Sequence, residues 1–182
     1  LSVNSFLDIY SYHFSEPVEH VKISFRGYDS PDIYGVALDG GSGLAVDNIG
    51  LRGSSGTVFT SISKSHLKKM YEFLNVELVI MQFGGNVLPY IEEDKEAENY
   101  GKWFYSQIMR VKSARPGVPV IVIGPSDMST KKKDKYVTFE FLEKVRDELK
   151  KAAFKADAGF WDMYEAMGGE NSMPSWVSAD PP

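Results

Sequence analysis

Two apolar strand-like runs separated by one long helical segment constrain the fold of this chain more than any other feature. Residues 76–82 read V-E-L-V-I-M-Q and residues 119–123 read P-V-I-V-I, as is typical of strands buried on both faces. Residues 91–114 predict a long helix that is acidic at its start and basic at its end, which complements the helix dipole. Strand, helix and strand joined by short loops give parallel strands in one sheet. The sequence therefore predicts an α/β fold.

The same alternation continues beyond this unit. Residues 61–75 and 138–156 predict amphipathic helices, and residues 159–164 predict a third strand. The run Lys131-Lys132-Lys133 predicts a solvated loop. Together these segments indicate a parallel sheet with helices on its faces.

Residues 1–45 have a different pattern. Apolar residues alternate with period two, most cleanly over Val21–Phe25, and glycine-rich turn clusters separate the alternating segments. This pattern predicts a β-rich, sandwich-like segment over residues 1–45, as part of an accessory or inserted β module. Residues 46–182 then form the α/β domain.

Glycine-rich turns stand where strands of the predicted sheet end. Residues 46–56 read V-D-N-I-G-L-R-G-S-S-G, and F-G-G-N follows the strand at residues 76–82. The carboxyl ends of parallel strands meet at one edge of a sheet, where functional groups gather. A glycine N–H and an asparagine amide are donors of the kind that stabilise a developing oxyanion. An ordinary turn glycine and a turn-capping asparagine are the structural alternatives for Gly53 and Asn86.

These two blocks resemble those of a known family. N-I-G-L-R-G-S-S is similar to the second block of the SGNH (GDSL-type) hydrolases, and F-G-G-N is similar to their third block. The family includes lipase-like acylhydrolases and carbohydrate or peptidoglycan O-acetylesterases. The resemblance implies a flavodoxin-like three-layer α/β/α domain with Gly53 and Asn86 as oxyanion-hole donors. It also implies that the protein hydrolyses short acyl esters, such as O-acetyl groups on polysaccharide, without a cofactor.

The first and fourth blocks of the family are absent from these 182 residues. No G-D-S stands near the beginning and no D-x-x-H near the end. We therefore expect the nucleophilic serine and the basic histidine to lie outside this chain, and the domain to be incomplete at both ends. On this expectation residues 1–182 alone are inactive, and their partner is the remainder of a longer polypeptide.

Residues next to the two donors are expected to contact the substrate. These residues are Arg52, Ser54, Ser55 and Gly85. A surface arginine is the structural alternative for Arg52.

Other polar residues leave alternatives open. A Ser55–His66 pair is a rival nucleophile and base within the chain. Asp127 and Asp162 follow predicted strands, where each could orient a histidine or only cap a turn.

Composition limits the class of protein. The net charge is −5, which argues against nucleic-acid binding, and no cysteine is present for a disulfide or a thiolate nucleophile. No apolar run approaches the length of a membrane span, and no spacing of His, Asp and Glu suggests a metal site. We expect a periplasmic or secreted protein, with the cytoplasm left open.

Two other function classes compete with ester hydrolysis. The chain could be a non-catalytic carbohydrate-binding or structural module on a hydrolase scaffold, since two catalytic blocks are absent. It could also bind phosphate with its Gly50–Gly56 loop, although that loop lacks the G-x-x-x-x-G-K-[ST] spacing of a phosphate loop.

Overall fold

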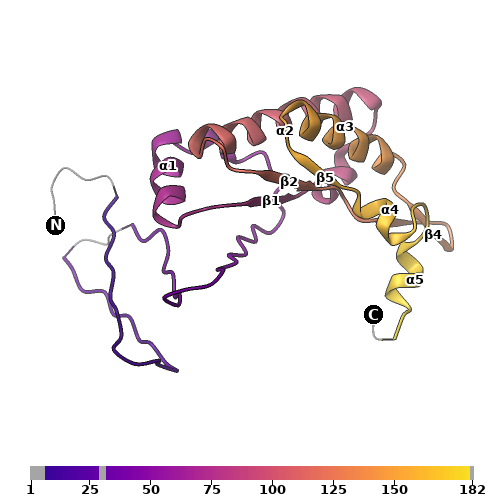
Figure 1. The fold of residues 1–182 in the computed structure, drawn as a ribbon. Helices are drawn as coiled ribbons and strands as arrows, with labels where there is room; N and C mark the ends of the chain where they lie inside the picture. Colours follow the sequence, from indigo (N-terminus) through magenta and orange to yellow (C-terminus); the bar gives the residue numbers. More distant parts are fainter. Residues whose placement is uncertain (1–6, 29–31, 181–182) are drawn as a thin grey trace. The chain divides into compact units, whose positions relative to one another are not determined.

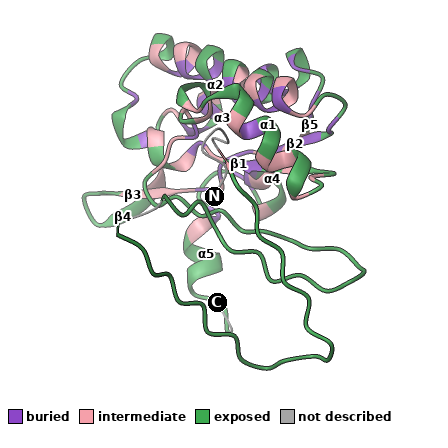
Figure 2. Ribbon diagram, turned by 90° about the vertical axis from the view of Figure 1, so that its left-hand side faces the viewer, coloured by how far each residue is buried: buried purple, intermediate pink, exposed green. Residues whose placement is uncertain are grey.

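The computed structural model describes residues 7–28 and 32–180, and the chain divides into two compact units, Leu1–Gly50 and Leu51–Pro182. In the first unit, the described residues contain no helix and no strand. They are exposed throughout, apart from a half-buried Leu7, as the green trace in Figure 2 shows. The predicted β-rich segment is therefore not confirmed over residues 7–28 and 32–45. Residues 1–6 and 29–31 lie outside the described part.

Backbone pairing explains why the period-two pattern of the first unit does not produce strands here. A strand is stable when a neighbouring strand accepts its hydrogen bonds and another layer covers its apolar face. No strand ladder forms among the described residues of this unit, so Ile23 and Phe25 stay about half exposed. Tyr12 and Phe14 make an edge-to-face ring contact at 4.9 Å.

The second unit is built around the predicted parallel sheet. Its strands β1 (Val79–Gln82), β2 (Val120–Ile123) and β5 (Gly159–Trp161) pair in the order β1-β2-β5, and both pairs are parallel. β2 is entirely Val and Ile, β-branched residues that suit a central strand. The prediction of a mixed α/β fold with a parallel sheet is confirmed.

Two long helices pack together on one face of the sheet (Figure 1). These helices are α2 (Asp94–Ala114) and α3 (Leu142–Lys155), and α1 (Lys64–Phe73) packs against α2. At the start of α2, Glu93 and Glu96 form a capping box. The acidic cluster at residues 92–94 is therefore explained by helix initiation.

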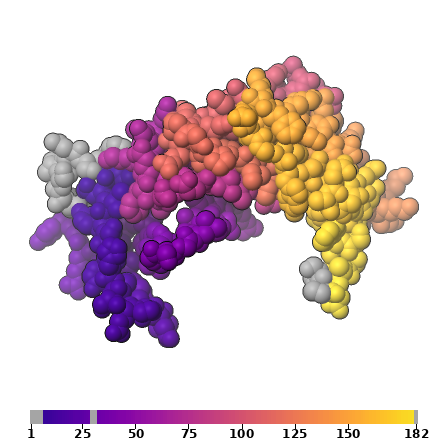
Figure 3. All heavy atoms as spheres, viewed as in Figure 1, coloured from indigo at the N-terminus to yellow at the C-terminus, as the bar shows by residue number. Residues whose placement is uncertain are grey.

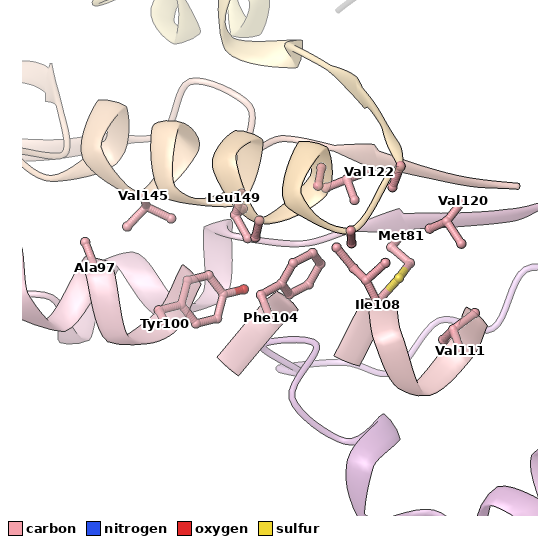
Figure 4. Close-up of a cluster of buried hydrophobic side chains, with 14 of the residues drawn as sticks. Met81, Ala97, Tyr100, Phe104, Ile108, Val111, Val120, Val122, Val145 and Leu149 are labelled. Carbon is pink, nitrogen blue, oxygen red and sulfur yellow. The ribbon is translucent and has the colours of Figure 1, made fainter. Parts of the chain in front are cut away.

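The core lies between these helices and the sheet. Met81 and Val122 from the strands meet Phe104 and Ile108 of α2 and Leu149 of α3, and all five side chains are almost completely buried (Figure 4). Because β-strand side chains alternate, residues one position away point to the other face.

That other face of the sheet is covered only in part by the described residues. The strand register aligns Ile80 with Ile121 and Ile123 with Trp161 on it. Ile80 is 56% exposed and Trp161 is 50% exposed. The predicted helical layer is thus complete on the α2–α3 face alone.

Short elements complete the unit and shift several predicted boundaries. Thr138 belongs to a hairpin strand, so the helix predicted from residue 138 begins only at Leu142. The predicted loop at residues 131–133 is wrong for Lys131 and Lys132, which lie in the other hairpin strand. The third strand ends three residues earlier than expected. The short elements are η1 (Phe59–Ser61), η2 (Gly85–Tyr90), β3 (Ser129–Lys132), β4 (Lys135–Thr138), α4 (Met163–Met167) and α5 (Met173–Val177).

Ion pairs hold the short helix α4 to α3. Arg146 Nη1 of α3 lies 2.8 Å from Glu165 Oε1 of α4 and 3.7 Å from Asp162 Oδ2. The yellow atoms of the C-terminal segment accordingly lie against the orange atoms of α3 in the space-filling view (Figure 3).

Candidate functional site

The turns that follow β1 and β2 meet at the carboxyl edge of the sheet. Gly84 follows β1 with φ +113°, and a Cβ there would lie 2.9 Å from Leu149 Cδ1 and 3.1 Å from Pro125 Cδ. Close packing therefore requires a glycine at this position. The chain then enters η2, which carries Asn86 at an exposed position.

A hydrogen bond joins the two glycine-rich blocks that the sequence singles out. The Nδ2 of Asn86 donates to the carbonyl oxygen of Ser54 at 3.0 Å, across 32 residues of sequence. This bond accounts for one of the two hydrogens on Nδ2. The structure therefore brings Asn86 next to the residue that follows Gly53.

Gly53 forms the corner of an exposed turn. The N–H of Ser54 donates to the carbonyl oxygen of Leu51 at 3.1 Å, and Gly53 has φ +76°. Nothing lies within 4 Å of the position that a Cβ of Gly53 would take. The turn itself explains the glycine, and its open side leaves room for another molecule.

The segment after this turn packs on the ring that precedes Gly84. Gly56 has φ +77°, and a Cβ there would lie 2.6 Å from the Phe83 ring. The Phe83 ring in turn contacts Phe59 and Phe104 at centroid distances of 6.3 and 5.8 Å. Residues 54–59 are therefore fixed over the end of β1.

Both serines of the turn are engaged in local hydrogen bonds. The Oγ of Ser54 accepts from the N–H of Gly56 at 3.1 Å, and the Oγ of Ser55 pairs with Thr57 Oγ1 at 3.0 Å. These bonds stabilise the turn and explain both hydroxyl groups without a catalytic role. His66, the base of the rival pair, lies half-buried in α1.

The other two expected substrate contacts differ in their surroundings. Arg52 is exposed beside the Gly53 turn. A Cβ on Gly85 would lie 2.8 Å from Met128 Sδ, so packing against Met128 accounts for that glycine.

Two residues of α2 that sequence reasoning missed hold the segment after the turn. The Tyr100 hydroxyl donates to the carbonyl oxygen of Ser55 at 2.6 Å, and burial raises the pKa of this phenol. The Gln107 side chain accepts from the Thr60 N–H at 2.9 Å and donates to Thr60 Oγ1 at 3.1 Å. The sequence signal was a pair of polar groups seven residues apart on the apolar stripe of a long helix.

Asp127 is a fully buried carboxylate behind this edge. It accepts hydrogen bonds from Thr138 Oγ1 at 2.7 Å, the Met173 N–H at 2.7 Å and Ser172 Oγ at 3.5 Å. These bonds tie the segment between β2 and β3 to β4 and to the start of α5, which gives the carboxylate a structural role.

Asp162 has a local role as well. Its Oδ1 accepts from the Glu165 N–H at 3.2 Å and so caps α4. This is the capping alternative that the sequence left open.

A groove of about 340 Å³ lies between η2 and the β3–β4 hairpin. Its lining combines aromatic rings with two carboxylates and one ammonium group, and it begins two residues beyond Asn86. The lining residues are Leu88, Pro89, Ile91, Glu92, Thr130, Lys132, Phe139, Glu140 and Phe141.

Metal-binding clusters and membrane-spanning helices are both absent from residues 7–28 and 32–180. This part of the chain contains no group of three or more His, Cys, Asp or Glu side chains that could hold a metal ion. None of its helices is both long and apolar enough to cross a membrane.

Comparison with known proteins gives a similarity in fold. No family model and no curated sequence matches the chain significantly. Among solved structures, a peptidoglycan O-acetylesterase ("in action, 5 min") matches with a TM-score of 0.57 at 18% sequence identity. The match covers 69% of this chain and 35% of that chain, so the present chain corresponds to about a third of that structure. At this identity the similarity shows a shared α/β fold over the matched part.

Proposed function

We propose that this chain carries the oxyanion-binding part of an SGNH-type serine ester hydrolase that cleaves short acyl esters. The observation that carries the proposal is the hydrogen bond from Asn86 Nδ2 to the Ser54 carbonyl. It places a side-chain amide beside the Gly53 turn, in the same pairing of blocks that the sequence resemblance implies.

The proposed chemistry is acyl transfer through a tetrahedral intermediate. A serine hydroxyl attacks the ester carbonyl while a histidine takes its proton, and the carbonyl oxygen becomes an oxyanion. The Gly53 N–H and the remaining Asn86 Nδ2 hydrogen are the proposed donors to that oxyanion. Collapse of the intermediate releases the alcohol, and water then hydrolyses the acyl-serine. The resemblance assigns neither the serine nor the histidine to a residue of this chain.

The proposed substrate class is an O-acetylated glycan. The fold neighbour is a peptidoglycan O-acetylesterase, which makes an acetyl ester on a sugar the first class to test. The groove beside η2 supports this choice because its rings can stack on sugar faces and its carboxylates can bind hydroxyl groups. A cell-wall polysaccharide as substrate would place the protein in the periplasm or outside the cell.

Acetate release tests the proposal directly. The protein as its gene encodes it, with residues 1–182 included, is assayed on nitrophenyl esters of two to eight carbons and on O-acetylated polysaccharide. We expect turnover that falls with acyl length, together with release of acetate from the polysaccharide.

The same assay separates the competing function. Glycan binding without acetate release would contradict ester hydrolysis and favour a non-catalytic carbohydrate-binding module. The groove beside η2 is the observation that supports this second function. Deacetylated glycan is the matched ligand for measuring binding apart from turnover.

A further inference from the structure

Residues 51–62 depend on other parts of the molecule for their position. Apart from the three-residue η1, this segment has no regular secondary structure. Its backbone carbonyl and N–H groups therefore need partners outside the segment wherever water is excluded. Four side chains supply them: Asn86, Tyr100, Gln107 and Arg110, whose Nη2 donates to the Thr60 carbonyl at 3.3 Å.

Tyr100 and Gln107 lie on the same face of α2 because seven residues make almost two helical turns. Both side chains are 3% exposed, and both are hydrogen-bonded to the segment. Ser55 and Thr60, their partners, are five residues apart, so the segment runs along α2 between the two contacts. We call Tyr100 and Gln107 the α2 clamp.

The clamp acts on the residue next to the one that Asn86 contacts. Tyr100 binds the carbonyl of Ser55, and Asn86 binds the carbonyl of Ser54. Two adjacent peptide groups are thus hydrogen-bonded to two different elements, that of Ser55 to α2 and that of Ser54 to η2. Any movement of Ser55 shifts Ser54 and the Gly53 turn relative to the Asn86 amide.

We propose that Tyr100 and Gln107 are positioning residues that fix the Gly53 turn against Asn86 and so set the spacing of the two oxyanion donors. Neither residue touches the reacting atoms in this account. The role in the reaction rests on the proposed ester hydrolase function, whereas the role in fixing the turn is independent of it.

Tyr100→Phe tests the clamp because it removes the hydroxyl and keeps the ring that packs on Phe104. Tyr105→Phe on the same helix is the matched control, since the Tyr105 ring contacts Lys155 instead of the segment. We expect hydrogen exchange at the amides of residues 54–57 to become about 3- to 10-fold faster in Tyr100→Phe, as loss of one hydrogen bond predicts. The control should leave exchange there unchanged.

Kinetics test the consequence for the site. Tyr100→Phe should lower kcat on a short acyl ester about 3- to 10-fold with KM within twofold. The same change in an Asn86→Ala background should lower kcat by twofold or less, because the donor that it positions is already missing. Equal effects in both backgrounds would overturn the positioning role.

A second variant tests the clamp independently, in case Tyr100→Phe fails to fold. Gln107→Leu keeps the side-chain size and removes both bonds to Thr60, so exchange should accelerate at residues 60–62 instead. Unchanged exchange in both variants would overturn the clamp whatever the activity. If the unmodified protein turns over no ester, the proposed function fails, and exchange still decides whether the clamp fixes the turn.

Discussion

Gly53 and Gly84 share a positive φ angle but differ in the space around them. A side chain at Gly84 would meet Leu149 and Pro125, whereas a side chain at Gly53 would meet nothing within 4 Å. Packing thus requires a glycine at position 84, whereas only the turn geometry favours a glycine at position 53. An open turn is what a donor to an external oxygen atom needs.

This difference predicts unequal costs for two alanine substitutions. Gly53→Ala should lower the free energy of unfolding by about 1–2 kcal/mol, the cost of a left-handed conformation. Gly84→Ala carries a similar backbone cost and adds about 1–3 kcal/mol of overpacking. Urea denaturation of both variants measures the difference. Equal destabilisation would mean that Gly84 is less tightly packed than the structure shows.

Tyr100 predicts a change of stability at high pH. Burial raises the pKa of its phenol well above the ordinary value of 10.0. The folded state therefore keeps a proton that the unfolded state releases above pH 10, so the unfolded state is favoured as pH rises. Below pH 10 both states hold the proton and the contribution is constant.

The size of this effect follows from linkage. Between pH 10 and the folded-state pKa, the free energy of unfolding should fall by up to about 1.4 kcal/mol per pH unit from this group. Tyr100→Phe should show a shallower decline than the unmodified protein, as measured by urea denaturation from pH 8 to pH 11. Parallel declines in the two proteins would contradict a protonated, buried Tyr100.

Among the elements, the sheet has one covered face and one partly covered face. Ile108 of α2 packs on the covered face and is fully buried, while Ile80 of β1 on the other face is 56% exposed. The two side chains are chemically identical and differ in burial. Substitutions of Ile108 and Ile80 therefore measure how much each face of the sheet contributes to stability.

We expect Ile108→Ala to lower the free energy of unfolding by about 2–5 kcal/mol, because it leaves a cavity in the core. Ile80→Ala should cost less than about 1 kcal/mol, since most of that side chain already contacts solvent. Chemical denaturation compares the two. A large cost for Ile80→Ala would show that the second face is covered in solution.

The elements that could be predicted from the sequence are those specified by their own residues. The strand at residues 120–123 is apolar throughout, and the strand at residues 79–82 is apolar up to Gln82. The helix at residues 94–114 has both a capping box and an apolar stripe. The β3–β4 hairpin was missed because its lysines are exposed and carry no apolar alternation.

The candidate site was predictable only in its two blocks. Gly53 and Asn86 are recognisable from their glycine-rich turns, although the strand expected before Gly53 is absent from residues 46–50. The bond between Asn86 and Ser54 depends on tertiary structure. Tyr100 and Gln107 resemble ordinary core positions of a long helix. Apart from the Thr60 hydroxyl, their partners are backbone carbonyl and N–H groups, which carry no sequence signal.

At the scale of the whole molecule, the two units differ in how their residues are protected. Residues 7–28 and 32–50 are almost entirely exposed and contain no helix or strand, whereas residues 51–180 contain the sheet and the core. Exposed backbone without secondary structure is where proteases cut first.

Limited proteolysis should therefore separate the units. We expect trypsin to cleave first at Lys22 or Arg26 and to leave a fragment that contains residues 53–180. That fragment should keep the far-ultraviolet circular dichroism and the thermal midpoint of the α/β unit. Early cleavage inside α2 or α3 would contradict this division.

The most direct test of the proposed chemistry is the steady-state kinetics of Asn86→Ala in the complete gene product, with Asn99→Ala on α2, outside both glycine-rich blocks, as the control. Loss of one oxyanion donor should lower kcat about 100- to 1000-fold and leave KM nearly unchanged. The control should retain full activity. Active protein with an unchanged kcat in Asn86→Ala would contradict the assignment of Asn86 as an oxyanion donor.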